Sequence, residues 1–209
     1  MEIIWLGHAS FKIKTQDKII YIDPYFGDYE DKADIILISH SHHDHLNMEK
    51  VNLISTDNTI IISSKEVAST IHGAKPLLPG QSEIVGEIAV EAVEAYNLNK
   101  EFHPKGFGVG FIITLEGKRV YFSGDTDKIP EMKSYDVDVA LVPVGGIYTM
   151  NSDEAVEAIK LIKPKFAIPM HFASGVVGTI DDAELFKEKV ELETDTKVTI
   201  LKHGESFKL

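Results

Sequence analysis

The sequence predicts an α+β fold, an αββα sandwich in which two mixed β-sheets pack face to face and helices cover their outer faces. Strand-type segments fall into two groups, and helix signals follow each group. The runs 34–39 and 138–144 are almost continuously apolar, as expected for strands buried on both faces. Each sheet can then bury one face against the other sheet and one under helices. A length of 209 residues favours one compact domain, 1–209.

The first half of the chain carries five predicted strands. Short β-branched or alternating segments place them at 2–6, 11–15, 18–22, 34–39 and 59–63. Asn47 is expected to cap a helix over 47–54. Ser64 is expected to cap a short helix that ends near Gly73, because glycine is typical just after a helix.

The second half carries the remaining strands and the two longer helices. The strands are predicted at 83–85, 88–96, 109–115, 119–123, 138–144, 166–170, 197–201 and 206–209. Asn151, with Glu154 three residues later, predicts a capped helix that runs to about Ile162. Thr179 opens the last helix, which runs to about Leu192.

The composition narrows the classes of function. The chain has no cysteine, which excludes a disulfide scaffold, a cysteine-ligated zinc and a thiol nucleophile. It shows no bilayer-spanning apolar segment and no signal-peptide pattern, so we expect a cytoplasmic protein. The net charge of -12 repels nucleic acid and anionic membranes and favours a small-molecule partner. A homo-oligomer is compatible with the sequence, which carries no sign of the oligomeric state.

The most informative segment is His40-Ser41-His42-His43-Asp44-His45, directly after the predicted strand 34–39. It holds four of the nine histidines. Loops beyond strand ends are where such folds place their chemistry. Three imidazoles and a carboxylate in the pattern His-x-His-x-Asp-His are ligands that suit zinc and, with small changes, iron, manganese or nickel. The segment therefore predicts one or two divalent metal ions, with zinc expected first.

Two later motifs extend this pattern. Ser123-Gly124-Asp125-Thr126 and Pro169-Met170-His171 each stand at the end of a predicted strand. Together with the histidine motif, in this order and spacing, they make the chain resemble metallo-β-lactamase-fold hydrolases over its whole length. The resemblance implies the αββα fold and an Asp125 that bridges two metal ions.

Two shorter segments resemble a narrower branch of that family. They are Trp5-Leu6-Gly7-His8-Ala9-Ser10 and Ile22-Asp23-Pro24. The branch includes the ascorbate-6-phosphate lactonases of the UlaG type. Asp23 is a candidate for orienting a ligand histidine through its second ring nitrogen.

The chemistry of the motif residues suggests two ion sites. The first two histidines of the motif lie two apart and can face one ion. Its last two residues follow a turn and can face a second ion, which the strand-borne histidine completes. The aspartate of the Gly-Asp motif can place one oxygen on each ion. The expected metal ligands are His40, His42, Asp44, His45, Asp125 and His171.

One position departs from the family pattern. The resemblance implies a third histidine for the first ion near the end of strand 88–96, where Asn97 stands. An amide oxygen is a poorer zinc ligand than an imidazole. Three interpretations stay open: the first site is weak and the enzyme is mononuclear, Asn97 contacts substrate or bound water, or another histidine, His103 or His8, completes the site.

Other residues are candidates for catalysis or substrate binding. Asp44 and His8 are candidates for protonating a leaving group, although a hydrogen-bonded structural role suits His8 about equally well. The candidates for substrate binding are Asn97, His103, Lys105 and Tyr148. Lys105 could bind an anionic group, but a solvated loop explains its surroundings as well. Tyr148 stands before a helix N-terminus, where backbone N–H groups can contact an anion.

These observations predict a metal-dependent hydrolase that acts on a small-molecule lactone, ester or phosphoester with a metal-activated hydroxide. Two metal ions lower the pKa of a shared water to near ~7 and polarise a carbonyl or phosphoryl oxygen. The alternative is a degenerate protein of the same fold that binds a small ligand or nucleotide without efficient turnover. Asn97 at the place of an expected ligand is its main support.

Overall fold

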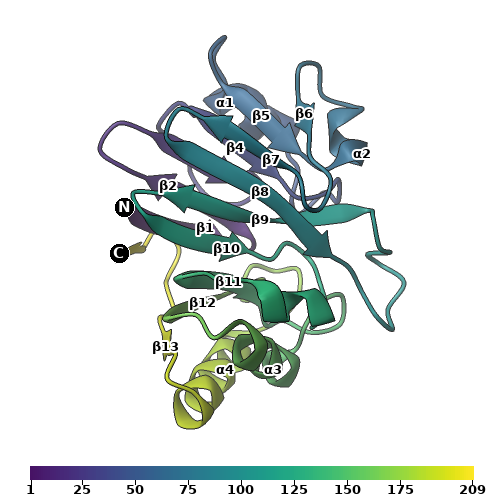
Figure 1. The fold of residues 1–209 in the computed structure, drawn as a ribbon, viewed down its shortest axis with the longest axis vertical. Coiled ribbons are helices and arrows are strands. Elements are labelled where there is room, and N and C mark those ends of the chain that lie inside the picture. Colours follow the sequence, from purple (N-terminus) through teal and green to yellow (C-terminus); the bar gives the residue numbers. More distant parts are fainter.

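Two seven-stranded β-sheets face each other, with helices on the outside of each sheet (Figure 1). The computed structural model describes residues 1–209. The strand orders are β14-β1-β2-β3-β4-β5-β6 and β13-β12-β11-β10-β9-β8-β7. This arrangement confirms the predicted sandwich of two mixed sheets covered by helices.

The first sheet is antiparallel at its β14 end and parallel from β3 to β6. Helices α1 and α2 belong to this half of the molecule (Figure 1). The strands are β1 (Glu2–Gly7), β2 (Ser10–Lys14), β3 (Ile19–Ile22), β4 (Ile35–Ile38), β5 (Ile60–Ser63), β6 (Lys75–Pro76) and β14 (Ser206–Lys208), and the helices are α1 (Met48–Ile54) and α2 (Lys65–Ala68).

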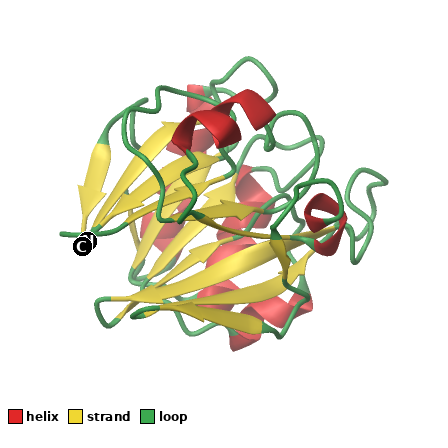
Figure 2. Cartoon of the chain, turned by 90° about the horizontal axis from the view of Figure 1, so that it is seen from above, coloured by secondary structure: helices red, strands yellow, loops and turns green.

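The second sheet repeats this plan, antiparallel from β7 to β10 and parallel from β10 to β13. Seen from above, the strands of the two sheets lie between helices (Figure 2). The strands are β7 (Ser82–Val85), β8 (Ile88–Ala95), β9 (Gly108–Leu115), β10 (Lys118–Phe122), β11 (Val139–Pro143), β12 (Phe166–Met170) and β13 (Lys197–Val198). The helices are α3 (Ser152–Ile162), α4 (Ile180–Glu193) and the 3-10 helix η1 (Pro130–Ser134).

Strand β4 shows why its sequence is apolar at every position. Ile35 and Leu37 belong to the main core, which includes the interior between the sheets. Ile36 and Ile38 belong to a second cluster with Val51 of α1. Because successive side chains of a strand point to opposite faces, both faces of β4 are buried, as predicted.

The longer helices begin as predicted. Asn151 and Glu154 form a capping box at α3, in which the Asn151 side chain accepts from the Glu154 N–H and the Glu154 carboxylate accepts from the Asn151 N–H. Thr179 precedes α4, as expected. None of the helices combines the length and the apolar character that crossing a membrane would need.

Helix α2 is shorter than predicted and ends at Ala68 instead of near Gly73. The Ser69 hydroxyl donates to Glu66 O and the Thr70 hydroxyl to Val67 O. Such side-chain bonds compete with the continuing helix for its carbonyl groups. The two-residue strand β6 and the 3-10 helix η1 were not predicted, because elements this short leave no periodic pattern.

Candidate metal centre

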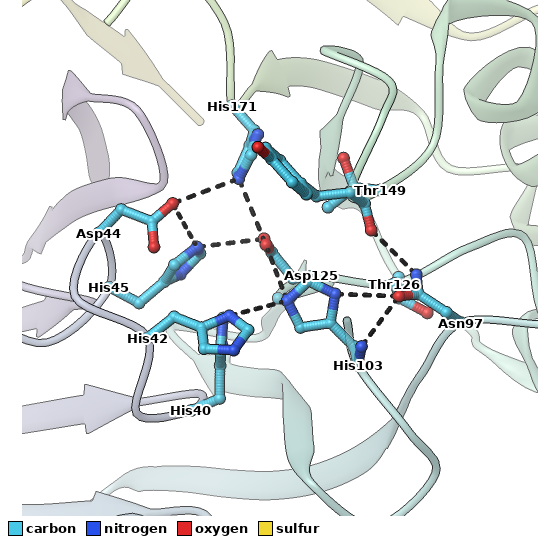
Figure 3. A network of polar contacts seen from close by, with 12 residues as sticks. His40, His42, Asp44, His45, Asn97, His103, Asp125, Thr126, Thr149 and His171 are labelled. Carbon is cyan, nitrogen blue, oxygen red and sulfur yellow. Dashed lines mark hydrogen bonds and ion pairs between the residues drawn. The ribbon is translucent and has the colours of Figure 1, made fainter. Parts of the chain in front are cut away.

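Five separate segments bring ligand-type side chains together at one edge of the sandwich (Figure 3). They are the turn after β1, the loops after β4 and β8, and the ends of β10 and β12. The ligand atoms form three groups, within each of which they lie within 4.8 Å of one another, and one of the three joins Asp23 to His40 and His45. The first group is His40, His42 and His103, and the second is His8, Asp44, His45 and His171.

Asp125, which follows β10, lies between the two groups. Its Oδ1 atom is 3.2 Å from His45 Nε2. Its Oδ2 atom is 3.3 Å from His103 Nε2 and 3.3 Å from His171 Nε2. One buried carboxylate therefore faces a histidine of the first group and two histidines of the second (Figure 3).

Hydrogen bonds behind the first group fix the tautomer of His40. Ser39 donates its hydroxyl proton to Asp23 Oδ2 at 2.6 Å. The Ser39 oxygen therefore accepts from His40 Nδ1, at 2.9 Å. His40 Nε2 is left with a free lone pair, buried and without a hydrogen-bond partner. An imidazole held in this way presents the nitrogen that metals bind.

Asp23 orients the second group as well. Its Oδ2 atom accepts from His45 Nδ1 at 2.6 Å, and its Oδ1 atom accepts from the Ser39 backbone N–H at 2.7 Å. The predicted orienting contact between Asp23 and a histidine of the motif is therefore present. Burial raises the pKa of Asp23, against the bonds from His45 and Ser39.

Asn97 lies behind His103 and not in the ligand group. Its Oδ1 atom accepts from the His103 backbone N–H at 2.9 Å and from His103 Nδ1 at 3.1 Å. Its Nδ2 group donates to Asp127 Oδ1 at 3.1 Å and to Tyr148 O at 3.0 Å. The amide makes these four bonds and is 8% exposed, so its polar groups are engaged within the protein and do not support the predicted contact with substrate. The structure instead brings His103 to His40 and His42, the third interpretation above.

His8 is fully buried behind Asp44. His8 Nε2–H donates to Asp44 Oδ2 at 3.1 Å, because an ionised carboxylate only accepts, and Nδ1 accepts from the Ser174 hydroxyl at 2.7 Å. Burial lowers the pKa of His8 to about 4, so the ring is neutral near pH 7. Burial raises the pKa of Asp44, but the His8 hydrogen bond and the charge of His45 outweigh it, and the pKa is below its ordinary value.

Backbone strain marks the same residues. His8, Asp23 and His171 have φ angles of 53°, 44° and 61°, in the left-handed region that side chains disfavour. Each such residue costs about 1–3 kcal/mol and persists where the surrounding structure requires it. The His171 N–H donates to His8 O at 2.9 Å, and a Cβ atom at Gly145 would collide with the His171 carbonyl. The hydrogen bond and the close packing at Gly145 therefore keep the strained backbones of His8 and His171 in place.

The buried ligand atoms lack partners within the protein. His40 Nε2, His45 Nε2, His171 Nε2 and Asp125 Oδ1 form no hydrogen bond. His45 Nε2 and Asp125 Oδ1 lie 3.2 Å apart, yet their geometry is not that of a hydrogen bond. Buried polar atoms without partners are rare, and atoms that converge without bonding to one another fit a shared cation.

The charge of the centre also fits a cation. Asp23, Asp44 and Asp125 are buried, and their ion-pair partners are histidines, with no lysine or arginine. Burial alone would lower the pKa of His45, but the carboxylates of Asp125 and Asp23 raise it well above its ordinary value. A divalent cation would take over the role of that proton. The donor set of imidazoles and carboxylates suits zinc and its neighbours.

The centre opens to solvent through a hollow of about 260 Å³. Its walls are His42, His43, Asp44, Phe102, Asp125, Tyr148 and Val176. A larger hollow of about 580 Å³, at the C-terminal ends of α3 and α4, is lined by no histidine. The chemistry therefore marks the site better than the size of the cavity does.

Two predicted substrate contacts differ from expectation. Lys105 does not line the hollow, because its Nζ atom lies 3.0 Å from Glu131 Oε1 and 3.3 Å from Glu94 Oε1. Tyr148 does line the hollow, but its backbone N–H donates to Gly146 O and is not free for an anion. Its ring packs against Phe102, another wall residue.

Sequence reasoning missed four residues around the centre. Ser39 and Ser174 hold site histidines through their hydroxyl groups, and Phe102 and Val176 line the hollow. Ser39 immediately precedes the histidine motif, which is a signal that could have found it. The other three stand in loops without a pattern, so only the fold brings them to the centre.

The chain is similar to a described family and to curated relatives. Residues 2–171 match the model of the beta-lactamase superfamily domain. A UPF0173 metal-dependent hydrolase of Pelotomaculum thermopropionicum is 36% identical, with all of both chains covered. Another from Archaeoglobus fulgidus is 36% identical over 99% of this chain and 98% of its own.

Solved structures agree with this similarity. A metal-dependent hydrolase from Parabacteroides distasonis superposes with a TM-score of 0.87 at 33% identity, covering 95% of this chain and 91% of its own. Igni18, a metallo hydrolase from Ignicoccus hospitalis, gives 0.82 at 27% identity, covering 100% and 98%. The narrower resemblance to ascorbate-6-phosphate lactonases stays a prediction, because these relatives do not test it. The chain belongs to the UPF0173 family of metal-dependent hydrolases within the metallo-β-lactamase superfamily, and it is a metal-dependent hydrolase.

Proposed function

We propose that the enzyme hydrolyses a small molecule at a dinuclear metal centre. His40, His42 and His103 would hold the first ion, Asp44, His45 and His171 the second, and Asp125 would be a ligand of both. The observation that carries the proposal is the position of buried Asp125 between the two groups. The Nε2 atoms of His40 in the first group and of His45 and His171 in the second are buried without hydrogen-bond partners. Each ion would then have three ligands besides Asp125, and substrate or water would bind as a further ligand, as zinc sites that expand to five ligands allow.

Bound divalent ions supply an activated water at neutral pH and polarise the oxygen of the bond to be cleaved. The side chains of the protein orient the ligands of these ions. Asp23, Ser39 and Asn97 accept from the Nδ1 atoms of His45, His40 and His103, which turns the Nε2 atom of each ring toward the centre. Asp44 lines the hollow with its pKa held below the ordinary value, so it stays ionised as a ligand, and buried His8 acts through Asp44 by holding its Oδ2 atom.

The substrate is proposed to be a lactone, an ester or a phosphoester. A hollow of about 260 Å³ is suited to a small molecule and too small for a folded polymer. The net charge of -12 supports a substrate other than nucleic acid. Zinc is the proposed metal, because imidazole and carboxylate ligands at this density suit it, with manganese, iron and nickel as the alternatives.

The alternative of ligand binding without turnover loses its main support. That interpretation depended on Asn97 as the replacement of a metal ligand. His103 stands in the first group instead, with its Nε2 atom 3.1 Å from His42 Nδ1. A complete set of ligands favours catalysis.

The test combines metal content with hydrolysis. We expect the zinc-loaded protein to hold two ions per chain and to hydrolyse simple lactones or esters. The His42→Ala variant should lose most of the activity, while His72→Ala, at an exposed histidine outside the centre, should keep it. A protein that takes up no metal, or that binds two ions and cleaves no lactone, ester or phosphoester, would contradict the proposal.

A further inference from the structure

Apart from the expected metal ligands, the residues that line the hollow are mostly apolar. Phe102 and Val176 line it together with Tyr148, and exposed His43 is the remaining wall residue besides the expected metal ligands. Phe102 is 46% exposed although it directly precedes a buried ligand histidine. A large aromatic side chain left open at the mouth of a catalytic centre indicates a contact with something that arrives there.

Phe102 and Tyr148 form a defined pair. Their ring centroids are 4.7 Å apart and the ring planes are at 89°, an edge-to-face arrangement. This geometry is one that aromatic rings favour, so the two rings support each other's position. Two rings at right angles present a face and an edge to a further flat group, which can pack on both.

Polar contacts beneath the pair tie together the two loops that carry it. Asn97 Nδ2 donates to Tyr148 O at 3.0 Å, and Lys100 Nζ donates to Thr149 O at 3.0 Å. Asn97 and Lys100 belong to the loop of Phe102, whereas Tyr148 and Thr149 belong to the loop after β11. The aromatic pair is therefore preformed, which reduces the entropy lost when a ligand binds.

The hollow has no permanently charged cationic side chain. None of its wall residues is a lysine or an arginine. Of the two lysines in the Phe102 loop, Lys100 is paired with Asp127 and lies 3.6 Å from Glu154, and Lys105 is paired with Glu94 and Glu131. A phosphate or carboxylate on the non-reacting part of a substrate would find no partner there and would meet the acidic protein surface.

We propose that the substrate presents a neutral aromatic or flat apolar group to the Phe102–Tyr148 pair and carries no second anionic group. The inference deepens the proposed function and rests on it. It narrows the substrate class to neutral lactones or esters with an aromatic part, and it sets the phosphorylated lactones of the resembling branch aside.

The binding of ligands that are not hydrolysed tests the proposed contact with the Phe102–Tyr148 pair. The probes are two lactams that resist hydrolysis, 1,4-dihydroisoquinolin-3-one, which carries a fused benzene ring, and 2-piperidinone, which does not. Calorimetry on the zinc-loaded protein should show the aromatic lactam binding at least about 10-fold tighter. Equal affinity for the two lactams would overturn the inference.

A matched pair of variants localises the contact. Phe102→Ala should weaken binding of the aromatic lactam roughly 10-fold, and leave 2-piperidinone and the metal content unchanged. Leu98→Ala is the control, because Leu98 lies in the same loop, is 51% exposed and does not line the hollow. An effect of Leu98→Ala as large as that of Phe102→Ala, or none from either, would contradict the assignment.

Hydrolysis separates this inference from the proposed function. 3-Isochromanone and δ-valerolactone share an alkoxide leaving group and differ in the aromatic ring, and glucono-δ-lactone can be compared with its 6-phosphate. We expect the highest kcat/KM for 3-isochromanone and the lowest for the phosphorylated lactone. Preference for the phosphorylated lactone would refute the inference and leave the hydrolase intact, whereas no hydrolysis of any ester or phosphoester by the two-ion protein would refute both.

Discussion

His103 Nδ1 donates to Asn97 Oδ1 at 3.1 Å, so the amide that stands where a third ligand histidine was expected lies directly behind the histidine that takes its place. The Asn97 oxygen also accepts from the His103 backbone N–H at 2.9 Å. This contact fixes the ring so that Nε2 faces His42 and Asp125. Asn97 acts on the centre through His103 and through no atom of its own.

Replacing Asn97 should weaken the first metal site and spare the second. In Asn97→Ala, His103 loses the acceptor that orients its ring, and partners of this kind are typically worth 10-fold to 100-fold in metal affinity. Zinc titration of the chelated protein should show one weakened and one unchanged site, and Leu98→Ala should leave both unchanged. Two unchanged sites in Asn97→Ala would show that the ring is held by other contacts.

Replacing Asp23 should damage both sites at once. Asp23 bonds His45 directly and reaches His40 through the Ser39 hydroxyl. Asp23→Asn cannot satisfy all of these buried donors, which should lower the free energy of unfolding by about 1–3 kcal/mol and weaken both metal sites. Chemical denaturation and elemental analysis measure the two effects. Asp28→Asn, at an exposed carboxyl, is the control and should change neither.

The chelated protein should lose stability as the pH falls from about 6.5 to about 4. Burial lowers the pKa of His8 from 6.5 to about 4, so over this interval the unfolded chain takes up a proton that the folded protein does not. The cost grows to roughly 3 kcal/mol at the acidic end. Thermal unfolding across this interval should show a steady decline of Tm that is shallower in His8→Gln. A Tm that rises on acidification would contradict the buried neutral state.

The core between the sheets should be intolerant of truncation. Phe111 on β9 is fully buried among residues of both sheets, so Phe111→Ala should cost about 3–5 kcal/mol in the free energy of unfolding. Ile84→Ala on β7 removes an apolar side chain that is 72% exposed and should change stability by no more than about 0.5 kcal/mol. Urea denaturation of both variants measures the difference. Similar costs for the two would contradict the described packing.

Much of the fold was predictable because its signals are local. The apolar run that became β4 and the Asn151–Glu154 box at α3 each follow from a few neighbouring residues. The role of His103 was not predictable in the same way. The strand β8 ends at Ala95, and the sequence places Asn97 at the position expected for a ligand, whereas the fold of the following loop decides which side chain reaches His40 and His42.

The residues on the substrate side of the centre could not be predicted either, because contacts between distant segments bring them together. Phe102 and Tyr148 are 46 positions apart in the chain and meet only because two loops are tied together by Asn97 and Lys100. For Lys105 a local pattern suggested a contact with substrate that the fold does not support. A cation three residues from the aromatic looked available to an anionic substrate, but its carboxylate partners come from β8 and η1, which no local pattern reveals.

The proposed function depends on a dinuclear centre in which His103 completes the first site. Anomalous diffraction from crystals of the zinc-loaded enzyme, recorded on both sides of the zinc absorption edge, locates the ions. We expect two peaks, one among His40, His42 and His103 and one among Asp44, His45 and His171, with Asp125 between them. A single peak at the second group, or a first ion without His103 among its ligands, would contradict it.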